Sequence, residues 1–118
     1  METMKENIIK NKSYQFAKAV VKCCRTLTAS REFVLSRQLL RSGTAIGALV
    51  REGEMAESKK DFIHKMSIAL KEANETIYWL DLLHDTDMID KEIYESLYPS
   101  AVELVKILIS IVKTSKSR

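Results

Sequence analysis

The sequence predicts an all-α protein, an antiparallel up-down-up-down four-helix bundle. Three observations predict it. Apolar side chains recur at intervals of three and four residues along four segments, and no stretch alternates apolar and polar residues as a half-buried strand does. The 118 residues include only three Gly and one Pro, whereas β-rich folds use many of both in turns. With 46% apolar and 30% charged residues, the composition is that of one globular domain.

The first helical segment follows a charged N-terminal stretch without an apolar run, which is not the pattern of a signal peptide. We expect residues 1–12 to form a basic extension, residues 13–115 to form the bundle and residues 116–118 to fray. Cys23 and Cys24 are adjacent, so a disulfide between them would be strained. We interpret them as packing residues in a reducing cytoplasm. The apolar stripe of this segment consists of Ser13, Ala17, Val20, Cys24 and Leu27.

The second segment combines large apolar side chains with an unusual run of small residues. Small residues allow another helix backbone to approach closely, and a local kink is the alternative interpretation. We favour close packing because Leu39 and Leu49 flank the run. The small residues are Ser42, Gly43, Thr44, Ala45, Gly47 and Ala48.

The third and fourth segments carry recognisable start signals. Ser58 with Asp61 three residues later resembles a capping box, and Asp87 or Asp90 can cap the fourth helix. Pro99 removes a helical hydrogen bond, so we expect the last helix to be kinked or broken near it, or to begin anew there. The core stripes are Phe62, Met66, Ala69, Ala73, Thr76, Leu80 and Leu83 in the third segment and Leu97, Ala101, Leu104, Leu108 and Ile111 in the fourth.

Charged residues border the apolar stripes of the second and third segments. A charge at the edge of a core must be paired or solvated. We therefore predict structural ion pairs between helices, with Arg41 meeting Glu72 or Glu75. Glu52 belongs to the same predicted set.

Basic residues concentrate near the N-terminus, although the net charge is only +3. Residues 1–31 hold seven Lys or Arg against two Asp or Glu, whereas residues 59–87 hold four against six. Lys18, Lys22 and Arg25 are spaced four and three apart and share one helix face. This stripe is a candidate nucleic-acid-binding surface, and a solvated helix face is the alternative.

The third segment has more apolar surface than one core can use, which predicts an oligomer interface. Burial of Trp79 in a thick core is the alternative. The candidate interface residues are Ile63, Leu70, Ile77, Tyr78 and Trp79.

Chemical motifs are not evident. His64 near Asp61, and His84 near Asp81 and Asp85, have spacings that could hold a metal, but surface histidines are the simpler interpretation. No Glu-x-x-His pair or glycine-rich phosphate loop occurs. We expect no enzyme activity, no cofactor, no metal and no membrane span.

Two runs resemble the bacterial 23S rRNA intervening-sequence protein family, or S23 family. They are residues 38–48, followed by Glu52, and residues 58–80 with the motif Tyr78-Trp79-Leu80. Arg51 departs from the neutral or acidic residue typical before Glu52. The resemblance covers about residues 14–111, and the family also includes accessory variability proteins of diversity-generating retroelements.

The resemblance implies a non-enzymatic four-helix protomer that assembles into a homopentamer. It also leaves three roles open. The first is RNA or DNA binding through the first helix, the second is a protein-interaction scaffold without a nucleic-acid role, and the third is an accessory subunit of a reverse transcriptase in a retroelement.

Overall fold

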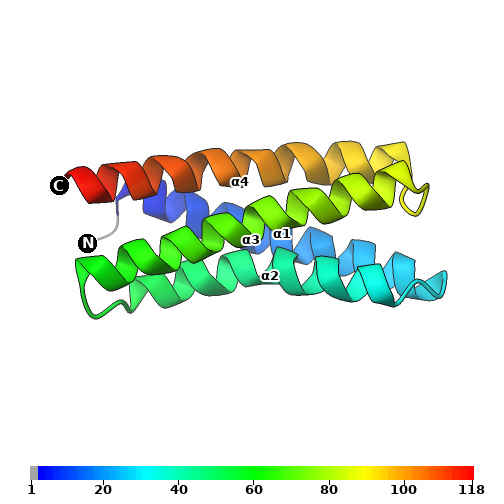
Figure 1. Cartoon of the computed structure of the whole chain (residues 1–118), viewed down its shortest axis with the longest axis horizontal. Helices are drawn as coiled ribbons and strands as arrows, with labels where there is room; N and C mark the ends of the chain where they lie inside the picture. Colours follow the sequence, from blue (N-terminus) through cyan, green and yellow to red (C-terminus); the bar gives the residue numbers. More distant parts are fainter. Residues whose placement is uncertain (1–2) are drawn as a thin grey trace.

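A computed structural model describes residues 3–118, which form four antiparallel α-helices (Figure 1). They are α1 (Met4–Ala29), α2 (Val34–Glu54), α3 (Lys59–Asp85) and α4 (Lys91–Ser117). Each helix packs against the next, and α4 packs back against α1, in a bundle of 46 × 21 × 18 Å. The start of α1 and the end of α4 lie at the same end of the bundle. The predicted four-helix, all-α fold is confirmed, and the described residues contain no strand.

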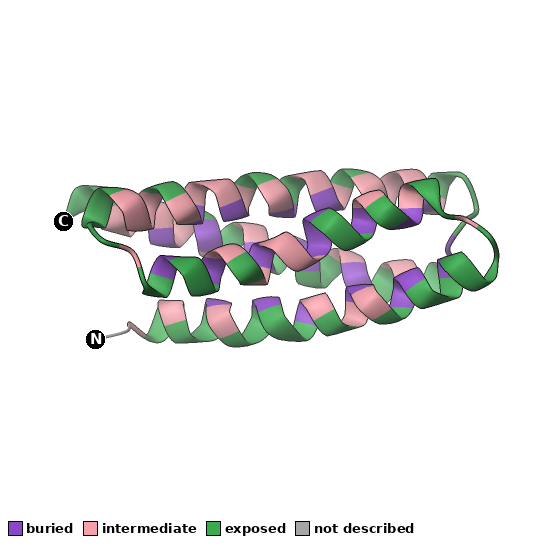
Figure 2. Ribbon diagram, turned by 90° about the horizontal axis from the view of Figure 1, so that it is seen from below, coloured by how far each residue is buried: buried purple, intermediate pink, exposed green. Residues whose placement is uncertain are grey.

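The core lies along the bundle axis, where the buried side chains of all four helices face one another (Figure 2). Leu39, Ile46, Leu80 and Leu108 are completely inaccessible to solvent. Burying a side chain of this size stabilises the fold by about 1.5–3 kcal/mol relative to leaving it exposed. Repeated along the four helices, this burial is what holds the amphipathic segments together.

The bundle begins earlier in the chain than the sequence predicted. Residues 4–12 do not form an extension but are the first turns of α1, and Ile9 is buried in the core at 1% exposure. Thr3 caps the helix: its hydroxyl accepts from Glu6 N at 3.1 Å, while the Glu6 carboxylate accepts from Thr3 N at 3.0 Å. The reciprocal capping box satisfies two otherwise unpaired amides. At the other end, α4 continues to Ser117, so residues 116 and 117 are helical.

Residues that the sequence predicted as helix caps do cap α3 and α4. The Ser58 hydroxyl accepts from Asp61 N at 3.0 Å at the start of α3, and Asp90 accepts from Ile93 N at 2.8 Å at the start of α4. Arg31 and Asp87 have positive φ values of 67° and 60° in the turns before α2 and α4. One left-handed residue reverses the chain within a few residues, which makes consecutive helices antiparallel neighbours.

The small residues of α2 allow α1 to pack closely against it, and α2 is one uninterrupted helix. A Cβ atom on Gly43 would lie 2.9 Å from both γ-carbons of Val20 on α1. A Cβ on Gly47 would lie 3.4 Å from the Ser13 carbonyl oxygen, an ordinary contact distance. Gly43 therefore leaves room for the Val20 side chain, whereas Gly47 lies against the Ser13 backbone.

The last helix runs without a break through Pro99, so the expectation of a separate helix starting there is wrong. Pro99 has no amide to bond to the carbonyl of Glu95, four residues earlier. Both residues are exposed, so water can satisfy that carbonyl, and the apolar stripe on the opposite face stays in the core.

Candidate functional site

The outward face of α1 carries the predicted basic stripe. Lys18, Lys22 and Arg25 are all exposed, and none of them forms an ion pair within residues 3–118. Other α1 lysines are paired to neighbouring helices: Lys10 to Glu54 and Lys12 to Glu103, both at 3.1 Å. The stripe therefore differs from Lys10 and Lys12 in having no carboxylate partner.

The three stripe residues are not equivalent. Lys22 borders a hollow of about 420 Å³ between α1 and α4, which is also lined by Asp90 and Glu92. Lys18 lies on the α2 side, where its Nζ is 5.2 Å from the centroid of the Tyr14 ring. Lys22 therefore lies beside carboxylates, whereas Lys18 lies beside an aromatic ring.

An aromatic and cationic group next to the stripe was not recognised from the sequence. The Tyr14 ring is 48% exposed, and the guanidinium carbon of Arg51 on α2 is 5.0 Å from its centroid. Together with Lys18, two cations therefore contact one ring without a carboxylate. Cation–π contacts hold a charge in place without neutralising it. The sequence clue was the heptad spacing of Arg37, Thr44 and Arg51, which places them on one stripe of α2.

A shallow hollow of about 320 Å³ opens beside the Tyr14 ring, between α1 and α2. Its floor is made of small side chains, because Gly47 and Ala48 have little or no side chain to fill it. The complete lining is Tyr14, Ala17, Thr44, Gly47, Ala48 and Arg51.

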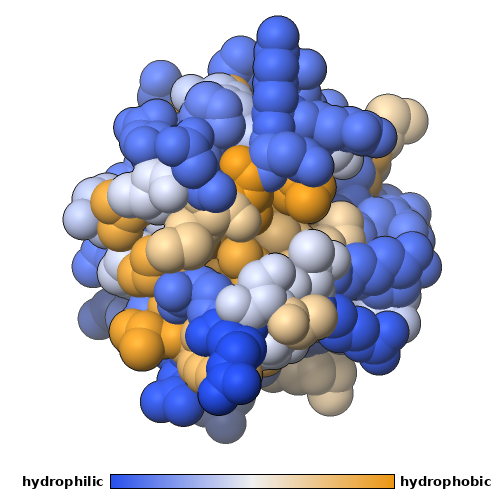
Figure 3. Space-filling view, turned by 90° about the vertical axis from the view of Figure 1, so that its right-hand side faces the viewer, coloured by the Kyte–Doolittle hydropathy of each residue, from blue (hydrophilic) through white to orange (hydrophobic). Residues whose placement is uncertain are grey.

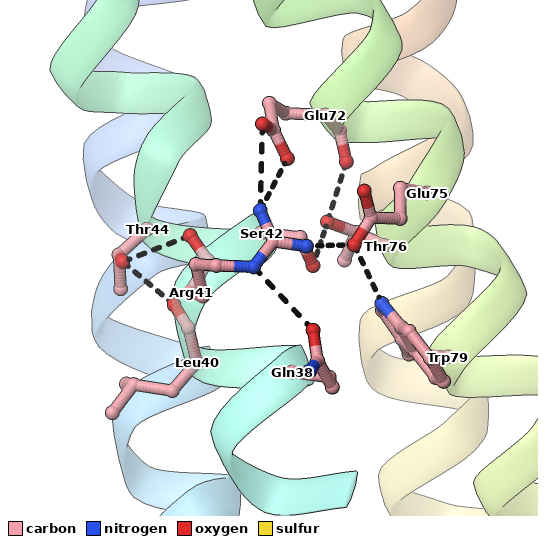
Figure 4. Close-up of polar contacts among 9 residues, drawn as sticks. All are labelled: Gln38, Leu40, Arg41, Ser42, Thr44, Glu72, Glu75, Thr76 and Trp79. Atoms are coloured by element: carbon pink, nitrogen blue, oxygen red, sulfur yellow. Dashed lines mark hydrogen bonds and ion pairs between the residues drawn. The ribbon is translucent and has the colours of Figure 1, made fainter.

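The predicted charge cluster between α2 and α3 is assembled around Arg41 (Figure 4). The Arg41 guanidinium donates to Glu72 Oε1 at 3.1 Å and to Glu75. Trp79 Nε1 donates to the same Glu75 oxygen at 2.9 Å, and Gln38 accepts from Arg41 Nε at 3.4 Å. Arg41, both glutamates and the Trp79 indole are thus joined in one cluster that links α2 to α3.

Glu52, the fourth residue of the predicted set, lies apart from this cluster. It pairs with Lys65 on α3 at 3.4 Å and is exposed. Exposed pairs of this kind contribute about 0–1 kcal/mol. The Arg41 cluster and the Glu52 pair both join α2 to α3, at different levels of the bundle.

The candidate interface residues on α3 divide into two groups. Leu70, Ile77 and Trp79 are half-buried against the core of their own chain. Ile63 is also half-buried, whereas Tyr78 is 58% exposed and contacts Trp79 edge-to-face with ring centroids 5.0 Å apart. Tyr78 is therefore the member of the set most available to a second subunit.

Apolar side chains are also exposed at the end of the bundle that carries the α1–α2 and α3–α4 turns. Figure 3 shows this end, with hydrophobic atoms in the middle of a hydrophilic rim. Phe33 and Val34 at the start of α2 are 52% and 73% exposed, and Met88 in the turn before α4 is 46% exposed.

The histidines do not form metal sites with the carboxylates near them. His84 stacks on Tyr94 with centroids 4.1 Å apart, and the Tyr94 hydroxyl donates to Asp81 at 2.7 Å. This hydrogen bond, with burial, raises the pKa of Tyr94 to about 12. His64 is exposed. No group of three metal-ligating side chains occurs among residues 3–118.

The two cysteines are buried free thiols. Burial raises the pKa of Cys23 to about 11, with smaller contributions from Cys24 and Asp90. Burial also raises the pKa of Cys24, although its hydrogen bond to Ser36 opposes the shift. Both thiols therefore stay protonated and unreactive at neutral pH.

Comparisons with known proteins agree with one another. The profile of the 23S rRNA-intervening sequence protein family matches residues 5–110. A protein with unknown function from the S23 ribosomal protein family of Bacteroides thetaiotaomicron is 53% identical in sequence. Its crystal structure superposes with a TM-score of 0.91, over 93% of this chain and 99% of that chain. No curated protein sequence matches significantly. None of the described helices is long and apolar enough to cross a membrane.

Proposed function

The chain belongs to the 23S rRNA-intervening sequence protein family, and we propose that it is a non-enzymatic, cytoplasmic homo-oligomer that binds RNA or DNA through the outward face of α1. One observation carries the nucleic-acid part. Lys18, Lys22 and Arg25 are exposed on one helix face, and within residues 3–118 none of them is neutralised by a carboxylate. Such a row of cations binds phosphates by releasing condensed counterions.

The modest net charge of +3 does not conflict with this function. Binding depends on the local arrangement of charge rather than on its sum, and acidic residues gather instead around the turn before α4, at Asp85, Asp87 and Asp90. Asp90 and Glu92 line the same hollow as Lys22, so we expect the Lys18 end of the stripe to bind phosphates most strongly.

The homo-oligomer, and specifically a pentamer, is proposed from the family resemblance and from the exposure of Tyr78. Aromatic side chains are enriched at the centres of subunit interfaces. Light scattering of the purified protein tests the assembly. Five subunits per particle are expected, and a monomer at micromolar concentration contradicts the proposal.

Salt dependence of RNA binding tests the nucleic-acid part. Fluorescence anisotropy of a labelled structured RNA is followed at several salt concentrations. For three phosphate contacts, the logarithm of affinity is expected to fall with the logarithm of salt with a slope of about −2 to −3 per subunit engaged. Lys18→Gln should reduce the magnitude of that slope by about one contact. Undetectable binding at low salt contradicts the proposal.

A protein-interaction scaffold is the second candidate, favoured by the exposed apolar residues Phe33, Val34 and Tyr78. A special case is an accessory subunit of a retroelement reverse transcriptase, which would use a protein surface and the basic face together. Tyr78→Ser and Lys18→Glu separate these roles. Partner capture that depends on Tyr78 and not on Lys18 supports a scaffold, whereas dependence on both supports the accessory role.

A further inference from the structure

We propose that the hollow between α1 and α2 is a binding site for single-stranded nucleic acid, in which Tyr14 and Arg51 hold one nucleotide. This inference rests on the proposed function. It extends that function from a row of cationic side chains to a site that prefers single-stranded nucleic acid. The occupant is a single strand, because an aromatic ring can stack only on a base that is free of its own partner.

The first argument is the charge around the Tyr14 ring. Lys18 Nζ and the Arg51 guanidinium lie 5.2 Å and 5.0 Å from its centroid, and neither cation forms an ion pair within residues 3–118. Two cations that converge without a counterion favour an anion between them. A phosphodiester has the charge and the acceptor oxygens that Lys and Arg side chains bind.

The second argument is the space beside the ring. The hollow of about 320 Å³ is lined by Tyr14 and Arg51, and the Arg51 guanidinium lies over the Tyr14 ring. Its floor is apolar or nearly so, because Ala17, Gly47 and Ala48 form it. A planar base can lie against such a floor and stack on the exposed Tyr14 ring, while Arg51 contacts the phosphate.

The third argument is that the charged walls continue along the groove. Arg25 lies seven residues beyond Lys18 on α1, and Arg37 lies fourteen residues before Arg51 on α2, so each pair shares a stripe. Both are exposed, and Cys24 and Ser36, their chain neighbours, are hydrogen-bonded to each other at 3.4 Å. Arg25 and Arg37 are therefore at the same level of the bundle. Partly exposed Leu40 continues the apolar floor on α2.

Binding of one RNA strand, alone and annealed to its complement, tests the proposal. Anisotropy is measured with an unstructured labelled oligonucleotide, with the duplex, and with an abasic strand that keeps only the sugar-phosphate backbone. Tyr14→Leu keeps an apolar residue on the exposed face and removes the ring. It should weaken single-strand binding about tenfold, the effect of losing one base–aromatic stack. Binding of the duplex and of the abasic strand should change much less, because Lys18 and Arg51 keep their charges.

Arg51→Gln should weaken binding of the single and the abasic strand alike, because it removes a phosphate contact. Lys113→Gln, at an exposed lysine of α4, is the matched control and should change neither. Circular dichroism verifies that every variant is folded.

Different experimental results would contradict this site and the proposed function. If the wild type binds and Lys22→Gln weakens it, but Tyr14→Leu affects single strand and duplex equally or not at all, the stacking site is wrong and the basic face stands. If the wild type binds none of the three probes at low salt, both the proposed function and this site are overturned.

Discussion

The Thr76 hydroxyl on α3 donates a hydrogen bond of 2.9 Å to Ser42 Oγ on α2, and both side chains have no solvent exposure. Thr76 also lies 2.8 Å from the Glu72 carbonyl, one turn earlier in its own helix. The pair sits directly beneath the Arg41 cluster, so a polar layer crosses the α2–α3 interface from core to surface (Figure 4).

Changing the two hydroxyl-bearing residues should therefore have unequal effects on stability. Thr76→Val leaves the Ser42 hydroxyl buried without this donor and should lower the free energy of unfolding by about 1–3 kcal/mol. Ser42→Ala leaves Thr76 bonded to the Glu72 carbonyl and should cost less than about 1 kcal/mol. In the Thr76→Val background, Ser42→Ala should be neutral or stabilising. Urea denaturation of the four proteins measures this cycle, and additive losses contradict it.

Two glycines of α2 should respond oppositely to the same substitution. Gly43→Ala forces a methyl group against Val20 and should lower the free energy of unfolding by about 1–3 kcal/mol. Gly47→Ala meets only an ordinary contact and gains helix propensity, so it should be neutral or stabilising by up to about 1 kcal/mol. The comparison is made by thermal or urea unfolding. Equal effects at the two positions would show that Val20 does not pack tightly against Gly43.

Replacing Pro99 should stabilise the protein. Pro99→Ala supplies an amide for the Glu95 carbonyl and removes the ring from the helix interior, for an expected gain of about 1–3 kcal/mol. Ser100→Ala, at the exposed neighbouring position, is the control and should change stability by less than about 0.5 kcal/mol. A Pro99→Ala variant that is no more stable than the wild type would mean that α4 has already accommodated the proline at no cost.

Stability should decline in alkali through the buried thiol of Cys23 and the hydroxyl of Tyr94. Folding raises the pKa of Cys23 from 9.0 to about 11 and that of Tyr94 from 10.0 to about 12. The unfolded chain therefore loses these protons first. Cys23 and Tyr94 therefore make their full contribution to the free energy of unfolding below pH 9.0. This contribution falls as the pH rises through 11 and then 12.

Chemical denaturation at a series of pH values measures this decline. Cys23→Ala should lessen it, and Tyr94→Phe should remove the tyrosinate absorbance that appears near pH 12 in the folded protein. If Tyr94 ionises at its ordinary pKa of 10.0, its hydrogen bond to Asp81 does not form in solution.

The fold could be predicted because its causes are local. The spacing of Val20, Cys24 and Leu27, and the capping signal of Ser58, are visible within a few residues. The N-terminal boundary was missed because charged and polar residues surround Ile9, although Ile9 lies four residues before Ser13 and continues the stripe. The unbroken α4 was missed because the cost of Pro99 depends on whether the carbonyl before it reaches solvent.

The candidate site was only partly predictable for a different reason. Lys18, Lys22 and Arg25 share one helix face, so spacing alone identifies them. Tyr14 and Arg51 come together across two helices, and their contact depends on the register that Gly43 and Val20 set. The pairing of Arg41 with Glu72 and Glu75 could be predicted because all three residues border apolar stripes. Glu52 borders the α2 stripe at another level of the bundle, where it pairs with Lys65 instead.

The central claim, that α1 is a nucleic-acid-binding surface, is tested most directly by reversing its charge. Lys18, Lys22 and Arg25 are replaced together by Glu, and Lys106, Lys113 and Lys116 of α4 are replaced by Glu in a second protein with the same net charge. RNA binding is measured at low salt, with light scattering to verify assembly. The account predicts that reversal on α1 abolishes binding while reversal on α4 weakens it only slightly. Equal loss in both proteins, or retained binding after reversal on α1, would contradict it.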